Sequence, residues 1–335
     1  MNFISVSDLA RNLLNQSQSQ VLKSRQVELT QELTSGVVQD QRKHLGGDLS
    51  LVSSVVRAQE LQQSYIKNNQ DVEIIAETMQ TALETIVESA DQLIDVTVIG
   101  PQTRLPQVAN VAKFQAAETI DTMISVLNTS VSGLYIFSGT AMQDQAVASS
   151  ETLLAELDLA ITGAVGPAGV GAAVDAFFAP GGTYDTTIYT GSTTDIQNAK
   201  IDERESVDLS VRADNDAIRD SFRAAAYAYA AGSDLIVADF EERASILAAS
   251  REATFSSKDG VLTLSANVGF AQQRIEDAIV RLRVQDGELQ QTYADLIGID
   301  EYDTATQLEA VNTRLEMVYA TTVRASRLSF LEYLR

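Results

Sequence analysis

The side chains best suited to chemistry are few in this chain, and their spacing matches no metal-binding motif. The sequence has one histidine, His44, and no cysteine, so a zinc site, which needs several imidazole or thiolate ligands, is not expected. The acids Asp214, Asp216 and Asp220 invite a calcium interpretation, but this loop lacks the glycine and the distal glutamate of an EF-hand. We expect helix capping at Asp214 or Asp216 instead.

Catalytic arrangements have no better support in the sequence. A single histidine without a nucleophile elbow cannot be placed in a catalytic triad. The glycine-rich stretch from Gly163 to Gly171 is not followed by Gly-Lys-Ser/Thr, so it does not predict a phosphate-binding loop. Paired acids such as Glu241-Glu242 are abundant, but nothing specific makes them a glycosidase pair. We therefore predict a protein that is not an enzyme and that uses no metal or cofactor.

The charge of the chain argues against nucleic-acid and membrane partners. The formal net charge is −22, and no basic stripe is present to neutralise a phosphate backbone. The negative sign also disfavours anionic membrane surfaces. Bases and acids nearly balance in residues 1–43 and again in residues 304–335, so the acidity lies in the middle of the chain. Near-neutral ends can pack densely against copies of themselves, whereas an acidic middle stays solvated.

Both ends of the chain have the spacing of amphipathic helices with a narrow apolar stripe. Apolar residues recur at steps of three and four near the C-terminus, and leucines recur at similar spacing near the N-terminus. Narrow stripes need a partner helix, so we predict that the two ends pair with each other or with neighbouring copies. The predicted assembly interface consists of Leu9, Leu13, Leu22, Leu29, Leu33, Leu308, Val311, Leu315, Val318, Leu328, Leu331 and Leu334.

The remaining pattern predicts a mainly α fold. We expect a long antiparallel helical bundle, terminal coiled-coil helices formed from both chain ends, and a small inserted module that contains α and β structure. The first predicted helix runs over about 7–34 and stops at Gly36, and the second runs over about 49–98 and is broken by Gly100-Pro101. Further helices are predicted over 233–254 and through the segment from Ile275 to Leu296.

The middle of the chain has a different composition. Most glycine clusters lie there, together with the β-branched stretch from Tyr184 to Tyr189, so we predict short strands in this module, and further ones near Leu134 and Ser206. The predicted domains are the N-terminal coiled-coil helix (1–43), the first half of the bundle (44–140), the inserted outward-facing module (141–203), the second half of the bundle (204–299) and the C-terminal coiled-coil helix (300–335).

Short segments in both flanks form an ordered set of motifs. They are the helix end Gln31–Gly36, the run Gly133–Thr140, the pair Val268-Gly269 with the helix Arg274–Leu296, the pair Tyr302-Asp303 leading to Leu308, and the terminal segment Ser329–Leu334. In this order they resemble the flagellin superfamily and, within it, the hook-associated protein 3 family of the hook-filament junction. The run Gly133–Thr140 resembles the Gly-x-Tyr-Leu-Phe-x-Gly-Thr segment that separates junction proteins from ordinary flagellins.

Two segments depart from the family pattern. Residues 37–48 replace a basic residue and an Asp-Asp-Pro-like run, and Ile99-Gly100-Pro101 replaces the usual Asn-Gly-Thr. The resemblance covers roughly 1–140 and 204–335, so these differences concern the local geometry of two loops.

The resemblance implies a mechanical role. It implies terminal helices that form the inner tube of the flagellum, and an adaptor between the other hook-filament junction protein and flagellin. It also implies export to the extracellular flagellum without a cleavable signal peptide, and an export chaperone that holds the C-terminal segment. Two alternatives stay open: flagellin proper, and more distantly a soluble acidic enzyme or binding module with its site in residues 141–202.

Overall fold

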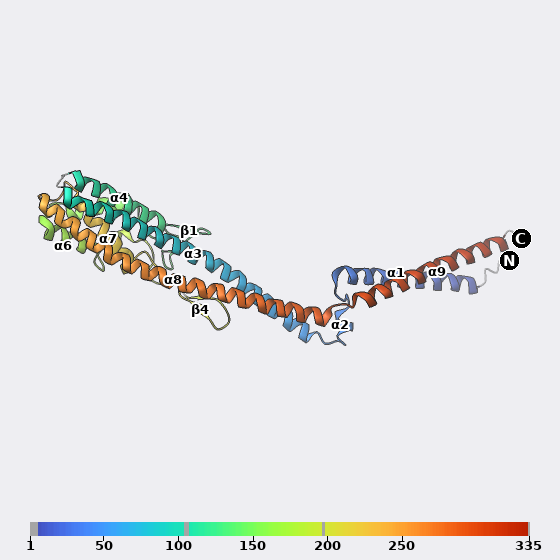
Figure 1. Cartoon of the computed structure of the whole chain (residues 1–335). Coiled ribbons are helices and arrows are strands. Elements are labelled where there is room, and N and C mark those ends of the chain that lie inside the picture. The colour runs from blue at the N-terminus through green and yellow to red at the C-terminus, as the bar shows by residue number, and fades with distance from the viewer. Residues whose placement is uncertain (1–5, 104–106, 196–197, 334–335) are drawn as a thin grey trace. The chain divides into compact units, whose positions relative to one another are not determined.

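The computed structural model describes residues 6–103, 107–195 and 198–333, and the side chains of residues 13–98, 108–195 and 198–324. Helices dominate, and the strands of the described residues form two short antiparallel pairs (Figure 1). The predicted mainly α fold with a small strand-containing module is therefore confirmed. The chain divides into two compact units, a smaller one of residues Met1–Gln63 and Arg283–Arg335 and a larger one of residues Ser64–Leu282.

The connections between the elements differ in length, and the longest, over residues 136–149, joins β2 to α5. In order they are α1 (Val6–Ser35), α2 (Gln41–His44), α3 (Ser50–Thr103), α4 (Gln107–Leu127), β1 (Ser130–Val131), β2 (Leu134–Tyr135), α5 (Ser150–Ile161), α6 (Gly166–Phe178), the π-helix η1 (Tyr184–Ile188), β3 (Ala199–Lys200), β4 (Ser206–Val207), α7 (Asp216–Ala231), α8 (Phe240–Ile297) and α9 (Glu301–Tyr333). Ser130 lies opposite Tyr135 in the first strand pair, and Ala199 lies opposite Val207 in the second. None of the helices described has the length and apolarity needed to cross a membrane.

The core of the larger unit consists of helix faces rich in small and aliphatic residues. The three- and four-residue steps of α3 put Met79, Leu83 and Ile86 on its buried face. Helices α4 and α7 approach each other closely through alanines, and at Gly232 an added Cβ atom would lie only 2.1 Å from the carbonyl oxygen of Ala109. Small side chains at such positions let two helix backbones come together.

The inserted stretch is more helical than the sequence predicted. Helix α5 begins after Ser149, whose Oγ accepts a hydrogen bond from the Thr152 backbone N–H at 3.3 Å, as N-cap residues do. The segment from Tyr184 to Ile188, predicted as a strand, forms the π-helix η1. The Tyr184 ring packs 5.5 Å from Phe178 and from Phe222, and its hydroxyl donates to Ala213. Burial of this ring outweighs the β preference of its neighbours.

The two longest helices continue through positions at which the sequence pattern predicts a helix end. Helix α3 reaches Thr103, past Gly100-Pro101, because a proline close to a helix end removes little of the hydrogen-bond ladder. Helix α8 joins the segments predicted as separate helices into one element of 58 residues. Gly260 lies within α8, and an added Cβ atom there would lie 2.8 Å from the Cβ of Ala217. The glycine therefore permits close packing and does not end the helix.

Candidate assembly interface

The two ends of the chain pair with each other in the smaller unit. Helices α1 and α9 lie side by side and antiparallel (Figure 1). The buried contact between them, which we call the terminal seam, consists of Leu29, Val311 and Leu315, with Leu22 and Leu308 packed against it. The steps of three, four and seven residues place these side chains on one face of each helix, so the pairing follows directly from the spacing in the sequence.

The predicted interface residues differ in how far the structure buries them. Leu29, Val311 and Leu315 are at most 8% exposed, and Leu22, Leu33, Leu308 and Val318 are half-buried. Leu13 is 60% exposed and stays outside the terminal seam. The side chains of Leu9, Leu328 and Leu331, and the whole of Leu334, lie outside the described residues.

Polar contacts set the register of the two helices. The Gln26 side-chain amide donates to Asn312 Oδ1 at 2.8 Å, and Arg25 Nη2 donates to Gln307 Oε1 at 3.1 Å. The Lys23 ammonium lies 5.7 Å from the centre of the Tyr319 ring, and its hydrogen bond to the phenol holds the pKa of Tyr319 below its usual value. The bond between the neutral side chains of Gln26 and Asn312 adds only about 1 kcal/mol, so it selects the alignment more than it stabilises it.

A short backbone bridge joins the ends of α1 and α8. The Val38 N–H donates to the Ile297 carbonyl at 2.9 Å, and the Ile299 N–H donates to the Gly36 carbonyl at 3.1 Å. Gly36 has a φ of +73°, which a glycine adopts without strain after a helix. At Gly298 an added Cβ atom would lie 2.3 Å from the carbonyl oxygen of Ala294. Two glycines therefore make possible the joint from which α1 and α9 extend.

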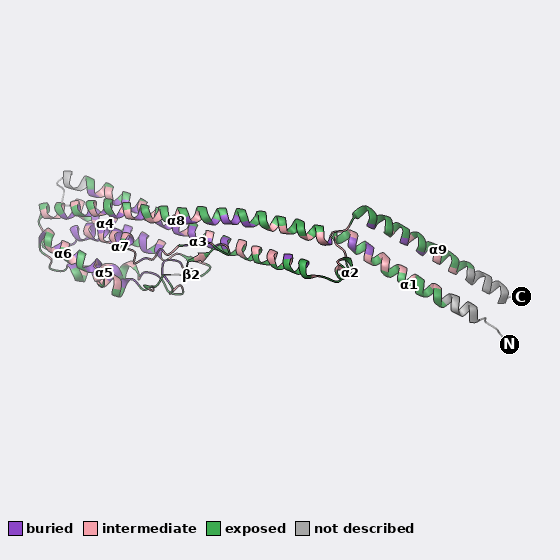
Figure 2. Ribbon diagram, turned by 90° about the horizontal axis from the view of Figure 1, so that it is seen from below, coloured by how far each residue is buried: buried purple, intermediate pink, exposed green. Residues whose placement is uncertain are grey.

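The terminal seam buries only one side of each helix. Figure 2 shows most of α1 and α9 as exposed, whereas α7 in the larger unit is largely buried. A groove of about 490 Å³ runs between the two terminal helices, lined by Ser17, Gln18, Val21, Leu22, Arg314, Met317 and Val318. Val21 and Met317 are 65% and 59% exposed. Leu22 and Val318 belong to the predicted stripe, but Val21 and Met317 lie off it, which is why the spacing argument missed these two residues.

The residues considered for metal binding take structural roles. No group of three or more potential ligands gathers among the described residues, and His44 is exposed on α2. The prediction that Asp214 or Asp216 caps a helix was wrong by one position. Asn215 caps α7 by accepting from the Ala217 N–H at 3.0 Å, while Asp214 pairs with Arg212 and Asp216 with Arg219. Asparagine is as good a cap as aspartate, and both carboxylates have arginine partners.

Two tyrosines whose pKa values are raised, Tyr227 and Tyr229, also have structural roles. Burial and contact with Asp175 raise the pKa of Tyr227 to about 12, and burial and contact with Asp158 raise that of Tyr229 to about 12. Each phenol stays protonated at ordinary pH and donates to its carboxylate, at 2.9 Å from Tyr227 and 3.2 Å from Tyr229. These donors join α7 to α6 and α5, and neither lies beside a nucleophile or a metal-binding group.

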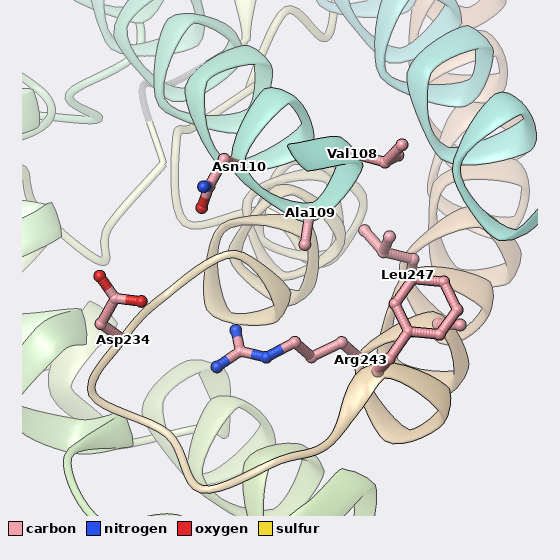
Figure 3. Close-up of a pocket in the computed structure, with 8 residues that line it drawn as sticks. Val108, Ala109, Asn110, Asp234, Arg243 and Leu247 are labelled. Carbon is pink, nitrogen blue, oxygen red and sulfur yellow. The ribbon is translucent and has the colours of Figure 1, made fainter. Parts of the chain in front are cut away.

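A cavity at one end of the larger unit also has a structural explanation (Figure 3). It has a volume of about 290 Å³ and lies beside Val108, Asn110, Asp234 and Arg243. The Arg243 guanidinium donates to the carbonyls of Ala231, Ser233 and Ala238 at 2.7, 2.9 and 3.2 Å, so it satisfies the last carbonyl of α7 and two carbonyls of the connection from α7 to α8. The cavity lies outside residues 141–202, where the enzyme alternative placed its site.

Comparison with known proteins identifies the C-terminal part of the chain. Residues 258–334 match the family model described as the bacterial flagellin C-terminal helical region. This part of the chain is similar to the C-terminal helical region of bacterial flagellins. This region includes residues 258–297 of α8 and all of α9, so it supplies one of the two helices of the terminal seam. The predicted resemblance to the flagellin superfamily is thereby confirmed.

Solved structures extend the likeness from this flagellin region to most of the fold. A protein of Vibrio parahaemolyticus described as a flagellar hook-associated protein matches 75% of this chain over 99% of its own length, with a TM-score of 0.52 and 13% identity. FlgL of Bacillus cereus matches 72% of the chain over 100% of its own length, with a TM-score of 0.50 and 14% identity. At these identities the likeness is one of fold. No curated protein matches the chain in sequence.

Proposed function

We propose that this chain is a structural, non-enzymatic subunit of the bacterial flagellum that acts as an adaptor at the hook-filament junction. The observation that carries the proposal is the terminal seam. It pairs the flagellin C-terminal region with α1 but leaves Val21 and Met317 more than half exposed. A helix pair with an apolar outer surface is suited to packing against further helices. Growth by addition of subunits through these helices follows from that arrangement.

The segment Gly133–Thr140 favours a junction protein over flagellin proper. Ile136 and Phe137 are buried in the core of the larger unit, and the Ser138 hydroxyl donates to the Tyr135 carbonyl at 2.9 Å. Gly139 has a φ of +59°, and an added Cβ atom would lie 2.5 Å from the Ser192 carbonyl oxygen. Gly139 therefore lets this run approach the backbone around Ser192 closely, which fits a motif with a structural purpose.

The proposed partners follow from the resemblance. They are copies of the chain, the other hook-filament junction protein, flagellin, and an export chaperone for the C-terminal segment; nucleic acid and membrane are not among them. The protein would act outside the cell, on the flagellum. Within it, residues 1–43 and 300–335 would form the inner coiled coil, 44–140 and 204–299 the helical wall, and 141–203 an outward-facing module.

A deletion of the gene tests this function. Cells without the chain are expected to assemble hooks but no filaments, and to release flagellin into the medium, because the filament has nothing to attach to. Electron microscopy of the cells and immunoblotting of the medium measure both effects, and the gene supplied in trans should restore filaments. Normal filaments in the deletion strain would refute the adaptor role. Long filaments formed by the purified chain alone would favour flagellin proper.

A further inference from the structure

A β-hairpin joins α3 to α8 near one edge of the larger unit. It consists of β3, β4 and the turn between them, residues 199–207, which we call the strap. The larger unit extends from Ser64 to Leu282, and the strap contacts α3 and α8 close to these two limits (Figure 1). Ile201 and Val207 of the strap are fully buried in the core. A strand pair this short is not stable by itself, so the strap depends on its contacts with the two helices.

Helix α3 binds one side of the strap through neutral side chains. Asn68 Nδ2 donates to the Lys200 carbonyl at 3.0 Å, and Asn69 Nδ2 donates to the Ile201 carbonyl at 2.8 Å. Asn69 is fully buried. Dissolved ions have little effect on hydrogen bonds between neutral groups that are shielded from water. The attachment of the strap to α3 should therefore be insensitive to salt.

Helix α8 binds the other side of the strap mainly through charge. Glu205 Oε1 accepts from Arg274 at 2.9 and 3.1 Å, and Glu205 Oε2 accepts from Arg281 at 2.9 Å. Arg281 also lies 3.5 Å from Asp202, and Arg274 donates to the Ser206 carbonyl at 3.0 Å. The two arginine side chains are 49% and 50% exposed. Ion pairs with this exposure stabilise little and are screened by salt, so α8 provides the weaker attachment.

The turn of the strap is held by bonds of its own. Asp202 Oδ1 accepts from the backbone N–H groups of Arg204 and Glu205 at 2.7 and 2.8 Å, and the Ile201 N–H donates to the Glu205 carbonyl at 3.0 Å. None of these bonds involves α3 or α8. The strap can therefore keep its shape and move as one piece when its contacts with α8 break.

We propose that the strap is a releasable fastening, which salt loosens from α8 while α3 retains it. Its release exposes Ile201 and Val207, so the released form is a minor state at low salt and becomes more populated as salt screens the ion pairs. Proteins open locally in this way at a lower cost than global unfolding. Salt thus sets how far the ordered core of the larger unit extends along α8. The contacts involve neither α1 nor α9, so this property goes beyond the proposed adaptor role.

Hydrogen exchange measured by mass spectrometry tests the strap in the full-length protein. Glu205→Gln removes the charge that both arginines bind, and Glu203→Gln, at an exposed position in the same turn, is the matched control. At low salt we expect Glu205→Gln to speed exchange in residues 199–207 and 271–282 by about threefold or more. The control and the peptides of α7 should stay at the wild-type rate. Equal rates in the two variants, or an equal increase in α7, would overturn the proposal.

Salt tests the same idea without a substitution. Raising NaCl from about 0.01 M to about 1 M shortens the Debye length from roughly 30 Å to roughly 3 Å. Exchange of residues 199–207 in the wild type, measured relative to α7, should then approach the rate of Glu205→Gln, whereas the variant itself should change little. A strap whose exchange does not respond to salt would refute the proposal.

A double-mutant cycle assigns the effect to the ion pairs. Replacing both arginines, Arg274→Gln together with Arg281→Gln, should speed exchange of the strap about as much as Glu205→Gln does. Adding Glu205→Gln to that protein should have no further effect, because the partners are already gone. Additive effects would mean that the three side chains act independently, and the proposal would be wrong. The gene-deletion test of the adaptor role does not depend on any of these results.

Discussion

Helices α1 and α9 form a pair, and so do α4 and α7, but the two pairs differ in how they are stabilised. Ten residues of α7 are buried, among them Ile218 and Phe222. In the described part of α1 the buried residues are Leu29 and Glu32. Most of a helix's stability in a folded protein comes from packing of its apolar face. The packing of α7 is therefore largely complete within one chain, whereas α1 and α9 leave most of their surface exposed, as the proposed assembly requires.

The largest effect should come from removing one helix of the weaker pair. Deletion of residues 304–335 should abolish incorporation into flagella, because α1 then has no partner. The larger unit should keep its fold, since its core does not include α9. Motility and electron microscopy measure assembly, and circular dichroism with thermal melting of the purified protein measures the fold. Normal motility would contradict the role given to the terminal seam.

A single charge in the terminal seam should have nearly the same effect on assembly. Leu315 is 5% exposed against Leu29 and Val311, and Leu315→Asp would bury a carboxylate there without a partner. Glu316→Asp, on the exposed side of α9, is the control and should assemble normally. Filament counts per cell compare the two variants. Equal counts would show that the terminal seam is dispensable.

A cavity in the stronger pair should cost stability in the purified monomer. Phe222 is fully buried, and Phe222→Ala should lower the free energy of unfolding of the larger unit by about 3–5 kcal/mol. Phe114→Ala, at a position 75% exposed on α4, should change it by less than about 0.5 kcal/mol. Urea denaturation followed by circular dichroism measures both. Similar losses from both variants would contradict the burial on which the comparison rests.

The pKa values of tyrosines in the two helix pairs should be shifted in opposite directions. Tyr319 in the terminal helices has a lowered pKa, whereas the pKa values of Tyr227 and Tyr229 on α7 are raised to about 12. A raised folded-state pKa contributes stability that is complete below the unfolded value near 10 and is lost as pH rises toward 12. The free energy of unfolding of the larger unit should therefore decrease as the pH rises from about 10 toward about 12. Tyrosinate absorbance should show an early step that Tyr319→Phe removes; the same early step in that variant would refute the assignment.

The smallest effect is expected in the inserted stretch. At Gly171 an added Cβ atom would lie 3.6 Å from the Tyr227 hydroxyl, an ordinary contact. Gly171→Ala should therefore stabilise α6 by at most about 1 kcal/mol and leave assembly unchanged. Thermal melting and motility check the two effects. A non-motile strain would show that this module takes part in assembly after all.

The parts predicted well from sequence are those where one local pattern decides the structure. The apolar steps placed Leu29, Val311 and Leu315 in the terminal seam, and Gly36 ended α1 as expected. Prediction failed where a contact between residues far apart in the chain decides the local structure. The Tyr184 ring packs between Phe178 and Phe222 in the π-helix, and the sequence near residue 184 does not report the contact with Phe222 on α7.

The candidate site was predicted only in part, because part of it also depends on contacts that the local pattern does not report. Periodicity identifies the stripe that two helices share, but it does not separate buried from exposed apolar residues elsewhere on each helix. Val21 and Met317 therefore went unnoticed, and Leu13 was included although it is exposed. The joint at Gly36 and Gly298 depends on backbone hydrogen bonds between segments far apart in the chain, which side-chain patterns do not reveal.

The bond between Gln26 and Asn312 spans 286 positions of the chain, whereas that between Gln115 and Gln92 spans 23. Closing the longer loop costs about 2 kcal/mol more in chain entropy, and contacts of such long range form slowly. Helix α1 leaves the ribosome first but has no intramolecular partner until α9 has been synthesised. The terminal seam can therefore fold only after all the residues between its two helices have been synthesised.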